Sequence, residues 1–214
     1  MTVTQQRSTV ASGRRSRRAG RERGIGARLL SVVIGLVLLG GAVWLQTLHM
    51  AEGEITDPIT YTGAKGEIVD ARRFSLRLDS ILAAKSIQSS MTTIGTDDVF
   101  LVVNVSAKSS LKPYHLAQPV LLTADGKRFD ATDRVNDDLT MAASWVQPDI
   151  WRSGRFFFEV PPSALPGAHV EFGLSKGFVV EPYQPEVEVD LGLDDEGARK
   201  LVASPQDVYS TDKK

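Results

Sequence analysis

Hydrophobic and polar positions divide the 214-residue chain into two unlike parts. Residues 29–48, LLSVVIGLVLLGGAVWLQTL, form an apolar run without a charged residue. At about 1.5 Å per residue a helix of this length spans about 30 Å, the thickness of a bilayer's hydrocarbon core. The pattern therefore predicts one transmembrane α-helix. Trp44 lies near its outer end, where an amphipathic ring prefers the membrane interface.

Beyond residue 65 the pattern changes to short β-like runs between turn signals. Phe74, Leu76 and Leu78 alternate with polar residues, which is the period-2 pattern of a half-buried strand. The nearly continuous apolar run 99–106 is typical of a strand at the centre of a sheet. Several short strands with abundant glycine and proline turns predict an all-β sandwich. Further strands are predicted at 119–123, 127–130, 155–160, 168–174, 178–180 and 187–191, with an Asp-Gly hairpin turn at 125–126.

Three segments carry weaker patterns. Residues 82–96 and 134–150 are largely polar or small, and we predict long loops there with a helical turn each. Residues 194–201 begin with acidic residues and predict a short helix, after which the chain is expected to fray. The predicted organisation is a tail at 1–28, a transmembrane helix at 29–48, a spacer at 49–65, a sandwich at 66–192 and a C-terminal tail at 193–214.

Charge sharpens this division of the chain. Residues 1–28 hold eight arginines and one glutamate, a net charge of +7, which leaves −8 for the remainder of a chain whose total is −1. The positive-inside rule therefore predicts a cytoplasmic N-terminus and an extracytoplasmic region after His49. We expect an uncleaved signal anchor; a cleaved signal peptide is the alternative. The basic tail is expected to be disordered and to contact anionic lipid rather than nucleic acid.

Five segments of the outer region carry a resemblance to a known family. The resemblance covers about residues 66–175, and the segment 106–113 is longer than its counterpart in the family. The five segments are 66–69, 74–78, 98–105, 122–129 and 154–161.

In this order the segments resemble the immunoglobulin-like domains of bacterial extracytoplasmic proteins, whose fold is similar to that of the small secreted immunogenic antigen of mycobacteria. The resemblance implies an immunoglobulin-like β-sandwich without established catalytic residues. Together with the arginine-rich tail it implies an actinobacterial source.

Candidate chemistry is sparse. Cysteine is absent, which excludes disulfides, thiolate metal sites and cysteine nucleophiles. The three histidines stand at no metal-ligand spacing, and we predict neither a catalytic residue nor a cofactor. The acidic loop 130–138 offers Asp133, Asp137 and Asp138 as weak calcium candidates, the alternative being a solvated turn.

Aromatic residues give the best candidates for binding a partner. Trp145 and Trp151 flank a proline-containing loop, and tryptophan is enriched at interface hot spots. The alternative is that one or both rings pack under the sandwich. If one ring is exposed, we expect it to be Trp145, because Trp151 adjoins the strand of Phe156. Tyr114 is a third candidate.

We therefore expect a single-pass membrane protein whose outer domain binds a membrane or envelope protein, as an accessory to a cell-envelope or transport complex, and that is not an enzyme. An envelope hydrolase and a small-molecule or calcium sensor are the alternatives.

Overall fold

The computed structural model describes residues 25–47, 57–89, 92–175 and 181–212. The chain divides into two compact units, residues 1–50 and 51–214. The predicted basic tail, His49 and the expected strand at 178–180 lie outside the described residues, apart from the last four residues of the tail.

The described part of the first unit is the helix α1 (Ile25–Thr47). Apolar side chains between Leu29 and Trp44 are more than half exposed. Judged by length and mean hydropathy over the described residues, no helix qualifies as a membrane span. The transmembrane segment is therefore not confirmed and stays a prediction.

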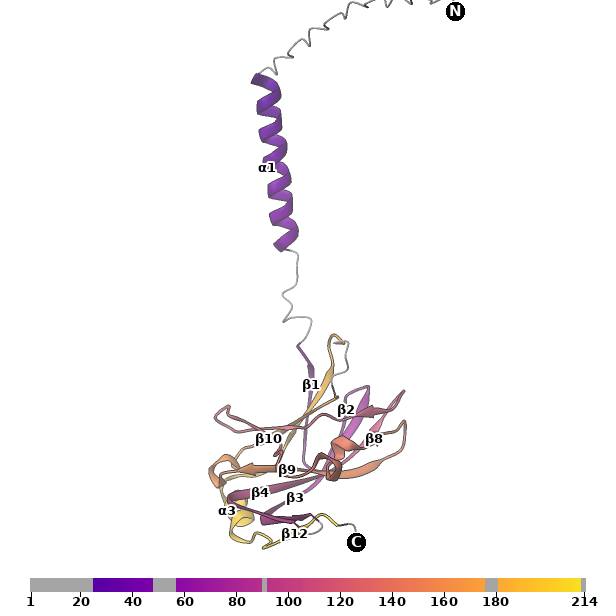
Figure 1. Ribbon diagram of the computed structural model, residues 1–214, viewed down its shortest axis with the longest axis vertical. Coiled ribbons are helices and arrows are strands. Elements are labelled where there is room, and N and C mark those ends of the chain that lie inside the picture. Colours follow the sequence, from indigo (N-terminus) through magenta and orange to yellow (C-terminus); the bar gives the residue numbers. More distant parts are fainter. Residues whose placement is uncertain (1–24, 48–56, 90–91, 176–180, 213–214) are drawn as a thin grey trace, which may run out of the picture. The chain divides into compact units, whose positions relative to one another are not determined.

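The second unit is built mainly of β-strands, as the sequence predicts (Figure 1). One five-stranded sheet has the order β1-β11-β10-β6-β7, and the other has the order β12-β3-β4-β9 with β2 paired to β3. The strands of the first sheet are β1 (Ile59–Ala64), β6 (Val120–Leu122), β7 (Arg128–Asp130), β10 (His169–Gly173) and β11 (Pro185–Asp190). Those of the second are β2 (Ile68–Asp70), β3 (Phe74–Ser89), β4 (Thr92–Ser109), β9 (Arg152–Val160) and β12 (Tyr209–Ser210).

Shorter elements complete the domain. The pair β5 (Tyr114–His115) and β8 (Trp145–Val146) forms a separate two-stranded ribbon. The remaining elements are three 3₁₀ turns, η1 (Asp137–Leu139), η2 (Met141–Ala143) and η3 (Pro162–Ala164), and the helix α3 (Asp195–Ala203).

Two apolar clusters hold the second unit together. The main cluster includes Phe74, Val103, Phe156 and Phe172, which come from both five-stranded sheets, so the sheets pack face to face as a sandwich. The second apolar cluster lies on the other side of β3, β4 and β9. Its buried members are Ala84, Ile87, Phe100, Val102, Val135 and Phe157.

The central strand and the hairpin were predicted correctly. The apolar run 99–106 lies in β4, which pairs with β3 on one side and β9 on the other. At the predicted Asp-Gly turn, β6 pairs with β7, and Gly126 has a φ of 81°, which only glycine adopts without strain. The helix α3 begins as expected, because the Asp194 side chain accepts a hydrogen bond from the Gly197 amide at 2.7 Å.

The predicted loop at 82–96 is wrong, because most of it belongs to the long β3–β4 hairpin. Register shifts near Asp79 and Lys85 break the alternation of apolar and polar residues that would have revealed a strand. The side chains of Ala84 and Ile87 are buried in the second apolar cluster.

The two predicted ends of the sandwich also need correction. Residues 59–64, assigned to the spacer, form β1, which pairs in parallel with β11. β1 is an edge strand in which Tyr61 packs against the main apolar cluster, and a Cβ on Gly63 would overlap Val69. The C-terminal segment does not fray as expected: β12 pairs with β3, and the Thr211 amide donates to the carbonyl of Gln88 at 2.9 Å.

Candidate functional site

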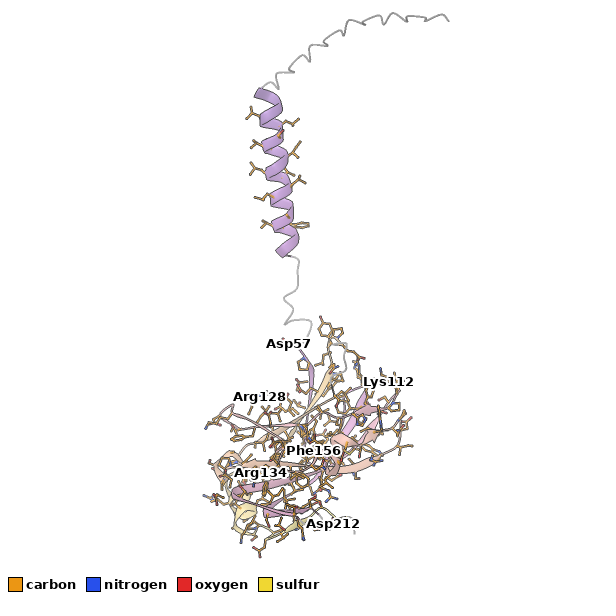
Figure 2. The ribbon with its side chains drawn as sticks, viewed as in Figure 1. Asp57, Lys112, Arg128, Arg134, Phe156 and Asp212 are labelled. Carbon is orange, nitrogen blue, oxygen red and sulfur yellow. The ribbon has the colours of Figure 1, made fainter. Side chains whose placement is uncertain are left out.

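Four loops meet at one end of the sandwich and form the candidate site. They are the β2–β3 turn, the segment between β4 and β5, the β8–β9 loop and the segment preceding β11. The Ser110 amide donates to the carbonyl of Arg73, and the Asp149 amide donates to the carbonyl of Ser109, both at 3.0 Å. These bonds join the first three loops. Lys112 marks this end in Figure 2.

Unusual backbone conformations are concentrated in these loops. Arg72, Asp149 and Tyr183 are the non-glycine residues with positive φ among the described residues, at 66°, 57° and 52°. Each belongs to a different loop of the candidate site. Such conformations cost about 1–3 kcal/mol each and are concentrated at binding and catalytic sites. The residues with positive φ therefore lie at the same end of the sandwich as the aromatic candidates.

Aromatic side chains line the first part of the site, a cavity of about 320 Å³ that we call the aromatic pocket. The rings of His115 and Trp145 lie on the paired strands β5 and β8, with their centroids 3.9 Å apart. His115 Nδ1 is 2.9 Å from the carbonyl oxygen of Ala142, which orients the imidazole ring. Tyr114 also lines the pocket.

Charged side chains form another wall of the aromatic pocket. Arg73 makes an ion pair with Glu181, which joins the segment preceding β11 to the other loops. Lys112 Nζ lies 3.9 Å from a carboxylate oxygen of Glu181 and 5.3 Å from the ring centroid of Tyr114. The pocket therefore offers flat rings beside both signs of charge, a combination that suits a ligand with an apolar face and a charged group.

A second cavity, of about 610 Å³, adjoins the first, and we call it the carboxyl pocket. The two cavities share the lining residues Leu174, Glu181 and Gln184, so they are adjacent, and we call the pair the groove. The carboxyl pocket is also lined by Pro58, at the point where the chain enters the domain, and by Gln118.

Two glutamates and one arginine give the carboxyl pocket its electrostatic character. Burial and a hydrogen bond with Glu171 raise the pKa of Glu186 to about 8. Burial opposes ionisation of Glu171 as well, but hydrogen bonds from Glu186 and Arg128 lower its pKa below the usual value. Arg128 donates to a carboxylate oxygen of Glu171 at 3.2 Å. Near neutral pH the two glutamates therefore share one proton.

The aromatic candidates from the sequence lie in two places. Tyr114 and Trp145 are together in the aromatic pocket. Trp151 instead lies over Arg77 and Lys108, whose charged groups are 5.8 and 5.7 Å from its ring centroid. Trp145 is 54% exposed and Trp151 is 40% exposed, so neither ring fills the core.

The acidic loop does not assemble into a cation site. Asp137 accepts a hydrogen bond from Gln118 at 2.7 Å, whereas the amide of Asp138 donates to the side chain of Asn136. Asp133 is exposed. Within the described ranges no three acidic, histidine or cysteine residues are placed to hold a metal ion.

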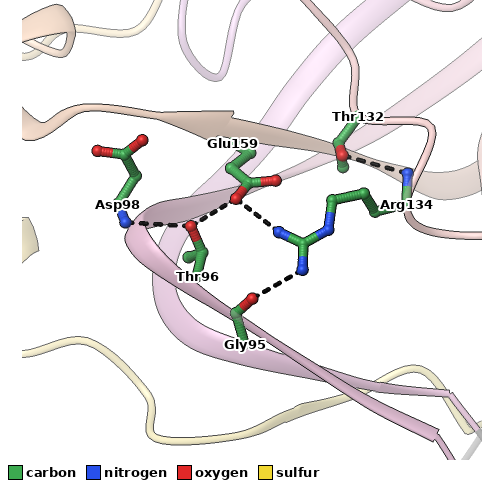
Figure 3. A network of polar contacts seen from close by, with 6 residues as sticks. All are labelled: Gly95, Thr96, Asp98, Thr132, Arg134 and Glu159. Carbon is green, nitrogen blue, oxygen red and sulfur yellow. Dashed lines mark hydrogen bonds and ion pairs between the residues drawn. The ribbon is translucent and has the colours of Figure 1, made fainter.

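The same loop takes part in a structural network instead (Figure 3). Arg134 donates to Glu159 at 2.7 Å and to the carbonyl of Gly95 at 2.9 Å. Thr96 donates to the same oxygen of Glu159 at 2.5 Å. Burial of Glu159 works against ionisation, yet these donors lower its pKa below the usual value. The network holds the segment that carries Val135 over the second apolar cluster.

Sequence reasoning missed the carboxyl pocket. Glu186 and Glu188 alternate with valines in β11, a signal that they share the outward face of a strand. The position of Glu171 beside them depends on the antiparallel register of β10 and β11, which pairs Glu171 with Glu188 and Gly173 with Glu186. Nothing in the local sequence specifies that register.

Comparisons with known proteins show similarity in structure alone. No family model matches the chain. A search of curated proteins also finds no match.

Three solved structures are similar to part of the chain. The YcdA protein of Bacillus subtilis is 17% identical with a TM-score of 0.41; the similar region covers 62% of this chain but only 39% of YcdA. The YjhA protein of Bacillus subtilis is 11% identical with a TM-score of 0.43, over 59% of this chain and 99% of YjhA. The secreted protein MPT63 of Mycobacterium tuberculosis is 15% identical with a TM-score of 0.39, over 63% of this chain and 98% of MPT63. At these identities and TM-scores none of them supports the transfer of an activity, ligand or partner.

Proposed function

We propose that this chain is an extracytoplasmic binding module held at a cell membrane by α1, with its N-terminus in the cytoplasm. Support comes from the apolar, exposed side chains of α1 and the eight arginines of residues 1–28, which the positive-inside rule assigns to the cytoplasmic side.

The observation that carries the binding role is the groove formed by the aromatic and carboxyl pockets. Its exposed Trp145 ring, which packs against His115 at a tilt of 51°, supplies apolar contact area of the kind found at interface hot spots. Arg73, Glu181 and Lys112 add charges that select an orientation. The groove suits a protein segment that presents an apolar or aromatic side chain beside charged groups.

In this proposal the partner is a membrane or envelope protein, and the chain is an accessory to an envelope or transport complex. The module binds without chemical turnover of the partner, requires no cofactor and does not contact nucleic acid. The domain lies outside the membrane, where such partners are accessible.

Site-specific photocrosslinking in cells tests this proposal. A photoreactive amino acid is placed at position 145 of the full-length chain, and captured proteins are identified by mass spectrometry. The matched control carries the same amino acid at Val208, an exposed apolar position outside the groove. Capture of one envelope protein from position 145 but not from 208 supports the proposal. Equal capture from both positions contradicts it.

Membrane anchoring is tested separately. The full-length chain is expected to stay with membranes after alkaline extraction, and a C-terminal tag is expected to be accessible to protease from outside. Release of the chain by alkali would overturn the anchor without affecting the groove.

A further inference from the structure

Three large apolar side chains stand exposed at the tips of the loops at the site end, and we call them the tip patch: Leu111, Ile150 and Trp151. Leu111 is 88% exposed, the highest value among the large apolar side chains described, and Ile150 is 63% exposed. The Asp149 amide bonds to the carbonyl of Ser109, which brings the loop of Ile150 beside the segment of Leu111. None of the three lines the groove.

Basic side chains surround the tip patch. Lys108 and Arg77 flank the ring of Trp151. Each also pairs with a carboxylate: Lys108 Nζ lies 3.5 Å from Asp149, and Arg77 Nε lies 2.6 Å from Asp79. Lys112 follows Leu111 directly, and Arg152 follows Trp151. The outward face of β10 and β11 is acidic by contrast, with Glu171, Glu186, Glu188 and Asp190. Among the described residues of the outer domain, the two most exposed large apolar side chains, Leu111 and Ile150, therefore lie beside cations, in an outer region that is acidic as a whole.

The tip patch belongs to the end of the domain at which the chain enters. The amide of Ile59, the first residue of β1, donates to the carbonyl of Gln184 at 3.0 Å. Glu181, three residues before Gln184, is 3.9 Å from Lys112. Between the last residue of α1 and Pro58 the chain can extend at most about 40 Å. If α1 crosses a bilayer, a tether of this length allows the outer domain to approach the membrane surface.

We propose that the tip patch docks on anionic phospholipid headgroups of the membrane that holds α1. This inference rests on the membrane anchoring in the proposed function. Aromatic and aliphatic side chains flanked by lysine and arginine suit the bilayer interface, where apolar tips enter the acyl boundary and cations meet phosphates. Docking leaves the groove beside the membrane surface, accessible to a membrane-protein partner.

Fluorescence quenching by brominated lipid tests the docking. The full-length chain with Trp44→Phe and Trp145→Phe keeps Trp151 as its single tryptophan. It is reconstituted into vesicles of phosphatidylcholine with phosphatidylglycerol, or of phosphatidylcholine alone, with bromines near the headgroup end of the acyl chains. Strong quenching is expected in the anionic vesicles. At high salt and in neutral vesicles it is expected to fall about twofold or more, because the cations then lose their attraction to the surface.

Matched variants separate docking from anchoring. Leu111→Ser with Ile150→Ser is expected to reduce the quenching of Trp151 about twofold or more, whereas Val208→Ser leaves it unchanged. Flotation of the same vesicles after alkaline extraction reports the anchor. A chain that floats but shows unquenched Trp151 in anionic vesicles refutes the docking alone. A chain that fails to float refutes the anchor on which the docking rests.

Discussion

Two surfaces of the outer domain carry similar apolar and aromatic side chains, but only one of them is covered. The segment of Val135, which we call the cover, and Tyr209 pack over the second apolar cluster. The ion pair between Arg134 and Glu159 holds this cover in place. At the loop end, the rings of Trp145 and Trp151 stay exposed. The cluster stabilises the fold, whereas the exposed rings contribute contact area that is free to be buried against another molecule. The comparison separates residues that fold the domain from those available for binding.

The largest expected effect is in the covered cluster. Phe157 is 1% exposed, and Phe157→Ala removes a buried ring and leaves a cavity, which costs about 3–5 kcal/mol of the free energy of unfolding. Thermal unfolding of the full-length chain in detergent, followed by circular dichroism, measures the loss. An unchanged melting temperature would show that the cluster is not part of the stable core.

A smaller loss of stability is expected when the contacts that hold the cover are removed. Arg134→Gln removes the ion pair with Glu159 and the hydrogen bond to Gly95. Because Arg134 is partly exposed, we expect the free energy of unfolding to fall by about 1 kcal/mol. Denaturant unfolding measures the change. Lys200→Gln, which breaks an exposed pair on α3, is the control and should cost less. If both variants lower the free energy of unfolding equally, the network of Figure 3 does not hold the cover in place.

The pH dependence of stability tests the protonation of the two glutamates in the carboxyl pocket. Because the pKa of folded Glu186 is raised to about 8, the folded chain keeps a proton that the unfolded chain releases near pH 4.5. Stability from this group is fully present below about pH 4.5 and is lost as pH rises towards 8. Glu171, whose pKa is lowered, acts in the opposite direction, and its contribution is lost as pH falls below its usual pKa.

Since Glu186 is only half-buried, solvent screening limits the effect to less than about 1 kcal/mol. Melting temperatures measured from pH 5 to pH 8 should decline, and Glu186→Gln should flatten the decline. A decline that is identical in Glu186→Gln would assign it to another group.

The smallest effect on folding is expected at the loop end. Leu111→Ser changes a side chain that packs on little, so the free energy of unfolding should stay within about 0.5 kcal/mol of the original. Chemical denaturation of this variant beside Phe157→Ala compares the two surfaces directly. A large loss in Leu111→Ser would make Leu111 part of the fold and remove it from the docking surface.

Particular residues show how far the sequence could predict the structure. The strand at 99–106 was predicted because one apolar run occupies both faces of β4, which clusters on either side cover. The strand residues of 82–96 were not recognised, because two register shifts disturb their alternation. For the site, Trp145 and Tyr114 could be nominated by residue type, but their meeting in one pocket could not, because it requires the pairing of β5 with β8.

The sequence by itself determined the division into an apolar helix and a β-rich outer region, the central strand, the Asp-Gly hairpin and the acidic start of α3. These features depend on hydrophobic period and local backbone preferences, which act between residues close in the chain. Only the tertiary structure decided that Glu171 lies beside Glu186 and that Arg134 binds Glu159. It also decided that Trp145 and Trp151 stay exposed. Those outcomes depend on strand register and on contacts between distant segments, which a local pattern does not specify.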